Sequence, residues 1–176
     1  MAEKSLRQIP LTSLFVALAI IFPMFFHMFG LGSTFLPMFL PVIVGSMLLT
    51  WRFALMLGII SPVSSWLLTG MPPIVPPILP VMVVELTIIS IIVSLLKVHL
   101  KQSVWIALIA AIVADRVVLY ILVSVIAPIF GIDSPLFTTA IVLSGLPGIA
   151  LQLITIPLLM KLIKEKIPSL TKVYQN

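Results

Sequence analysis

Long apolar runs, separated by short charged or Pro- and Gly-rich breaks, occupy almost the whole of this 176-residue chain. An α-helix needs about 20 consecutive, mostly apolar residues to cross the ~30 Å hydrocarbon core of a bilayer. The runs predict six transmembrane helices, at residues 9–28, 36–50, 53–69, 78–96, 104–127 and 146–163. We therefore expect an all-α membrane protein with one domain, residues 1–176, formed by a six-helix bundle.

The composition supports this fold class and excludes several others. Hydrophobic residues make up 61% of the chain and charged residues only 9%, whereas a soluble domain has about 45–50% and about 25%. A soluble enzyme and a nucleic-acid-binding domain are both excluded on this ground. The chain has no cysteine, which removes disulfides and thiolate metal sites as well.

The last apolar stretch, residues 136–163, is longer than one membrane crossing requires. As one helix its 28 residues would extend about 42 Å at ~1.5 Å per residue. It contains Ser144-Gly145-Leu146-Pro147-Gly148, which offers an N-cap and a proline near the first helical position. We expect the sixth helix to begin near Leu146, while a single, strongly tilted helix stays open as the alternative.

The distribution of basic residues predicts the orientation. The three breaks at residues 29–35, 70–77 and 128–135 contain no Lys or Arg. Nine basic residues lie at the termini or in the breaks on the terminal side: Lys4, Arg7, Arg52, Lys97, Lys101, Lys161, Lys164, Lys166 and Lys172. Because cytoplasmic loops are rich in Lys and Arg, both termini are predicted to be cytoplasmic, in a multi-pass protein of the cytoplasmic membrane.

Ionisable residues inside the predicted helices are candidates for a binding site. Arg116 lies about 18 Å from the inner end of its helix and Glu85 about 11 Å from the outer end of the preceding one. The two depths nearly coincide on antiparallel helices, so Glu85 and Arg116 can pair, with Asp115 as a competing carboxylate. Charged groups at this depth face a partner or a cavity. A structural ion pair and a ligand contact are both open.

The outer ends of the helices supply further candidates. Five prolines fall between Pro72 and Pro80, which predicts a stiff segment. This segment is either a lid over a cavity, carried by Met71, Pro72, Pro73 and Pro76, or a rigid connector. The remaining candidate substrate-binding residues lie near the same end: Trp66, Gln152, His27, Met38 and Phe35.

Catalytic motifs are missing from the sequence. It has no G-x-x-x-x-G-K-[ST] loop, so we expect that this chain does not itself hydrolyse ATP. It also lacks H-E-x-x-H and G-x-S-x-G motifs, and its two histidines are far apart. The sequence predicts neither an enzyme nor a bound metal or cofactor.

The order and spacing of several segments resemble the substrate-binding S components of the energy-coupling factor (ECF) vitamin transporters. The segments are Leu36–Val42, Leu68–Pro73, Val84–Leu86, Ala114–Val117 and Leu146–Leu153. Members of this family often carry His at the position of Phe39 and Gly at that of Asp115, and these departures concern the substrate more than the fold.

The resemblance implies a function and partners. An S component binds a vitamin or vitamin precursor at the outer face, such as pantothenate, a pyridoxine-like compound or a benzimidazole or ribazole precursor of cobalamin. It docks on a membrane scaffold (T) subunit that is coupled to two ATPases. The family's small-residue motif on the first helix, which contacts the scaffold, corresponds here to Ser13 and Ala17.

Two other functions are also consistent with the sequence. Glu85 and Asp115 could relay protons in a proton-coupled carrier of small molecules. The size of the chain is also similar to that of an MreD-like structural scaffold in the membrane.

Overall fold

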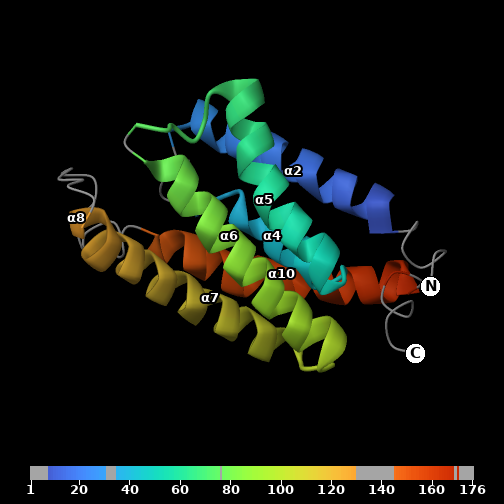
Figure 1. Ribbon diagram of the computed structural model, residues 1–176. Helices are drawn as coiled ribbons and strands as arrows, with labels where there is room; N and C mark the ends of the chain where they lie inside the picture. Colours follow the sequence, from blue (N-terminus) through green and yellow to red (C-terminus); the bar gives the residue numbers. More distant parts are fainter. Residues whose placement is uncertain (1–7, 31–34, 76, 130–144, 169, 171–176) are drawn as a thin grey trace.

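The computed structural model describes residues 8–30, 35–75, 77–129, 145–168 and 170, without the side chains of residues 126 and 127. All regular elements within these ranges are helical (Figure 1). They are α2 (Gln8–Met28), α4 (Phe39–Ser46), α5 (Trp51–Thr69), α6 (Ile78–Ser94), α7 (Val104–Ile121), α8 (Ala127–Ile129) and α10 (Leu146–Lys166). Two π-helical turns, η1 (Leu95–His99) and η2 (Leu122–Ile126), extend α6 and α7.

Five helices in the described part of the chain are long and apolar enough to cross a membrane. They are α2, α5, α6 with η1, α7 with η2, and α10. Each begins at or close to a predicted start, and α10 begins at Leu146, directly after the Gly145 break. Pro147 occupies the first turn of α10, where its missing N–H leaves no intrahelical hydrogen bond unmade.

The second predicted range, 36–50, does not form a long helix, which corrects the sequence analysis. It contains α4, whose eight residues extend only about 12 Å. All eight are buried. Hydropathy alone cannot distinguish a helix surrounded by lipid from one surrounded by other helices, because both are apolar on every side.

The chain nevertheless runs through the bundle in alternating directions. The start of α2 and the end of α10 lie at the same end of the bundle (Figure 1). At the opposite end lie the C-terminus of α5, the N-terminus of α6 and the N-terminus of α10. This arrangement places both ends of the described chain on one side, and the cytoplasmic identity of that side stays a prediction.

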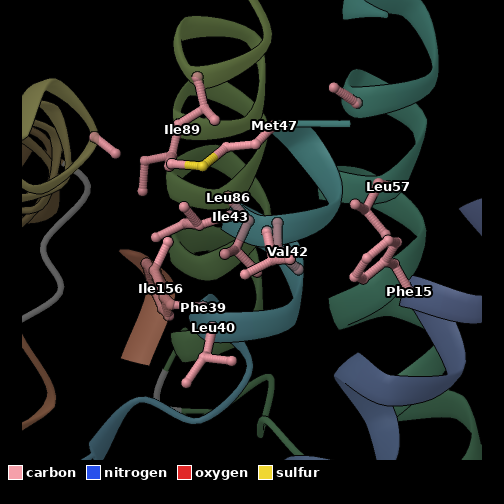
Figure 2. Close-up of a cluster of buried hydrophobic side chains, with 14 of the residues drawn as sticks. Phe15, Phe39, Leu40, Val42, Ile43, Met47, Leu57, Leu86, Ile89 and Ile156 are labelled. Atoms are coloured by element: carbon pink, nitrogen blue, oxygen red, sulfur yellow. The ribbon is translucent and has the colours of Figure 1, made fainter. Parts of the chain in front are cut away.

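The hydrophobic core surrounds α4. Phe39, Val42 and Ile43 of α4 pack among side chains from the longer helices (Figure 2). These neighbours are Phe15 of α2, Leu57 of α5, Leu86 and Ile89 of α6, and Ile156 of α10. The short helix therefore joins four long helices into one packed body.

The outward faces of the long helices are apolar as well. Ile21 and Phe25 of α2, Val113 of α7 and Ile154 of α10 are all more than half exposed. A soluble protein rarely exposes apolar patches of such extent. These faces are suited to lipid.

Candidate functional site

A cavity of about 390 Å³ lies at the end of the bundle away from the described termini. Its wall is formed by α6 and α7, the end of α2, the residues before α4, the segment after α5, and Gly145. The lining residues are His27, Leu36, Phe39, Met71, Pro72, Pro73, Ile78, Val81, Met82, Glu85, Arg116, Leu119, Val123 and Gly145. Most of them are apolar, and among these lining residues Glu85 is the acidic side chain and Arg116 the guanidinium.

Helical spacing brings the α6 and α7 residues to the cavity. Residues three or four positions apart share one face of a helix. Ile78, Met82 and Glu85 follow that spacing along α6, while Arg116, Leu119 and Val123 follow it along α7 and η2. The cavity is therefore lined by one face of each of two antiparallel neighbours.

Arg116 donates its Nε hydrogen to Asp115 Oδ2 over 2.9 Å, and its Nη2 also donates to that oxygen. Asp115 is 7% exposed and lies behind the cavity wall. The guanidinium thus folds back along α7 onto the preceding residue.

This geometry refines the expected pairing. Within the described residues, the ion pair of Arg116 is with Asp115, the competing carboxylate, and not with Glu85. Glu85 is only 4% exposed, and its Oε1 has no hydrogen-bond partner in the described part of the chain. Asp115 and Arg116 are close enough to Glu85 for both to act on it electrostatically.

The segment after α5 covers part of the cavity. Gly70 ends α5 in the left-handed conformation, with φ of 72°, which favours glycine at this position. The Met71 N–H then donates to Thr69 Oγ1 over 3.2 Å. Met71, Pro72 and Pro73 line the cavity, and Pro76 lies outside the described residues; a lid and a rigid connector both agree with this arrangement.

The start of α10 packs tightly beside the charged groups. A Cβ on Gly145 would lie 2.9 Å from Leu36 Cδ1 and 3.1 Å from Arg116 Nη1. A Cβ on Gly148 would lie 2.7 Å from the carbonyl oxygen of Phe35. The two glycines therefore let α10 approach both the guanidinium and the chain that enters α4.

Comparison with known proteins identifies the family. The family model of the ECF transporter substrate-specific component matches residues 7–163. The chain belongs to this family. No curated protein and no solved structure matches it. The matched region contains every helix that forms the cavity, and a substrate-specific component is an integral membrane transport subunit and not an enzyme.

The structure brings together only some of the residues predicted for the site of this substrate-specific component. His27 lines the cavity with Glu85 and Arg116. Met38 lines a neighbouring cavity of about 60 Å³ that shares His27, Leu36, Met71, Pro72 and Met82 with the larger one. Met38 therefore lines the smaller cavity and not the larger one.

Three predicted residues do not line either cavity. Gln152 is 3% exposed and lies in α10. Phe35 packs its ring against Phe26, with centroids 5.9 Å apart. Trp66 lies near the end of α5, half-buried. Depth along a helix does not determine the direction in which a side chain points, so it cannot tell which residues face a cavity.

Most of the apolar lining was not predicted from the sequence. Met82, Leu119 and Val123 carry no chemical signal that distinguishes them from lipid-facing residues. Their spacing from Glu85 and Arg116 was the available signal, because residues on the same face as a buried charge share its environment.

The small residues predicted to contact a partner lie on an outward face of this substrate-specific component. Ser13 and Ala17 are exposed on α2. The Ser13 hydroxyl donates to the Ile9 carbonyl oxygen over 3.0 Å, so its polar group is satisfied within the helix. Ser13 and Ala17 are therefore small, exposed residues that another membrane helix can approach closely.

Proposed function

We propose that this substrate-specific component binds a vitamin or vitamin precursor in the cavity beside Glu85 and Arg116, at the outer face of the cytoplasmic membrane. Uptake is then driven by ATP, through a membrane T subunit and two ATPases of an ECF module. The proposal agrees with the predicted orientation, which puts the cavity end outside.

The cavity is the observation that carries the proposal. Its 390 Å³ falls at the small end of the ~300–1,000 Å³ range of ligand pockets. Such pockets combine apolar walls with a few polar groups that orient the ligand. Here Phe39, Met71 and Met82 supply the apolar wall, and Glu85 and Arg116 supply the polar groups.

The exposed face of α2 supports docking to the T subunit. Ser13 and Ala17 leave a shallow place on this face, where another helix can approach closely. Uptake into liposomes is then expected only when the T subunit, both ATPases and ATP are present.

A binding assay tests the proposed site. We expect one member of a panel of vitamins and their precursors to bind the purified chain one-to-one, at micromolar or lower concentration, in calorimetry. Val123→Trp should weaken this binding at least about tenfold, because the indole fills the cavity that Val123 lines. Val125→Trp is the matched control in the same π-helical turn, since Val125 is 49% exposed. The proposal is wrong if no panel member binds, or if both variants bind like the original chain.

A further inference from the structure

We infer that Glu85 makes this cavity selective for small, flat ligands that carry a cationic or N–H-donating nitrogen, and that the cavity disfavours carboxylates. The inference rests on the proposed function and specifies the class of substrate. It differs from the simplest expectation for a buried arginine, which is that the guanidinium binds an acidic ligand.

Acidic side chains outnumber strongly basic ones at this wall among the described residues. Glu85 and Asp115 are two acids, and Arg116 is the guanidinium that acts on them. Since Arg116 donates through both Nε and Nη2 to Asp115 Oδ2, these two residues form a pair of zero net charge. Glu85, from the neighbouring helix, is the remaining acid.

One carboxyl oxygen of Glu85 also lacks a hydrogen-bond donor in the described part of the chain. It lines the cavity, is 4% exposed, and its Oε1 has no partner among the described residues. A buried polar group without a partner is destabilising. A ligand donor at this wall supplies the missing hydrogen bond, and a positive charge on the ligand balances the remaining acid.

A carboxylate ligand meets the opposite conditions. Glu85 repels it in a cavity where few other polar groups screen the charge. It also has to compete with Asp115 for the guanidinium of Arg116, and Asp115 is held beside that group by the helix itself.

The apolar walls favour a flat ring as the body of the ligand. Methionine sulfur makes favourable contacts with aromatic rings, and Met71 and Met82 both line the cavity with Phe39. The rigid pair Pro72–Pro73 closes one side. A substituted nitrogen heterocycle fits this combination.

Two ring-matched series of probes test the inference on the original chain in detergent. The first is pyridoxamine, pyridoxine and 4-pyridoxate, which differ in one ring substituent. The second is benzamidine, benzamide and benzoate. The dissociation constants are measured by calorimetry or competition. In at least one series the cation should bind most tightly, the neutral compound less tightly and the anion least tightly, with about tenfold or more between the dissociation constants of cation and anion.

The variant Glu85→Gln has nearly the same shape without the charge. It should reduce the ratio of the dissociation constants of anion and cation to about threefold or less. Glu165→Gln, on an exposed residue of α10, should leave the ratio unchanged. If Glu85→Gln does not fold, the order in which the probes bind to the original chain still tests the inference.

Three results would overturn the inference. They are tighter binding of the anion in both series, no binding of any probe, or an unchanged ratio in folded Glu85→Gln. The last result would mean that Glu85 carries a proton when the ligand binds. The proposed function survives the first and third results if a vitamin still binds in the cavity, so the two failures can be told apart.

Discussion

Asp115 determines what Arg116 can do in this protein. Neighbouring residues on a helix point about 100° apart, so their side chains meet only when a long one bends back. The Arg116 side chain does so, and it is 19% exposed at the cavity wall. The pair therefore joins two neighbouring residues of a single helix.

Replacing Asp115 by Asn should destabilise the protein. The amide keeps one hydrogen-bond acceptor but removes the charge that neutralises Arg116, at a cost of about 2 kcal/mol. The measurement is the thermal unfolding midpoint in a fixed detergent, with Glu165→Gln as the control. An unchanged midpoint for Asp115→Asn would show that the pair does not stabilise the fold.

The contact between α5 and α6 depends on one glycine. A Cβ on Gly58 would lie 2.7 Å from the Leu86 carbonyl oxygen and 2.8 Å from Thr87 Cα. Backbone atoms cannot move aside as a flexible side chain can. The two helices therefore touch along their backbones here. The contact lies at the two residues that directly follow Glu85 in α6.

The variant Gly58→Leu should separate α5 from α6. Overpacking of a buried contact costs about 1–3 kcal/mol, and here the clash is with backbone atoms. The expected result is a lower unfolding midpoint together with weaker ligand binding, because α6 carries Glu85. Ile59→Leu, on the neighbouring residue that is 37% exposed, serves as the control. If Gly58→Leu unfolds and binds like the control, the close contact is absent in the membrane.

The second apolar run shows where pattern reasoning fails at the level of elements. Residues 36–50 have the composition of a membrane-spanning helix, yet α4 has eight residues and is buried throughout. Their partners come from four other helices, and a local pattern does not contain those long-range contacts. By contrast, the start of α10 followed from local signals, Gly145 and Pro147.

The same division holds for the site. The sequence predicted that Glu85 and Arg116 lie at similar depth, and both line one cavity. It did not determine the partner of Arg116, because that choice depends on side-chain conformation. Nor did the sequence distinguish Gln152 and Trp66, which line neither cavity, from the residues that do.

The orientation of the whole molecule can be tested by labelling. Because the chain has no cysteine, single cysteines report position without background. Val75→Cys, on an 86% exposed residue at the cavity end, should react with a membrane-impermeant maleimide in intact cells. Lys166→Cys, at the end of α10, should react only after the membrane is opened. The reverse pattern would contradict the predicted orientation.

We propose above that substrate occupies the cavity between α6, α7 and the segment after α5. The most direct measurement is a structure of the chain determined with the tightest-binding panel compound. We predict density for the compound within hydrogen-bonding distance of Glu85 and in contact with Met71 or Met82. Density elsewhere in the protein, with this cavity unchanged and empty of the compound, would contradict the account.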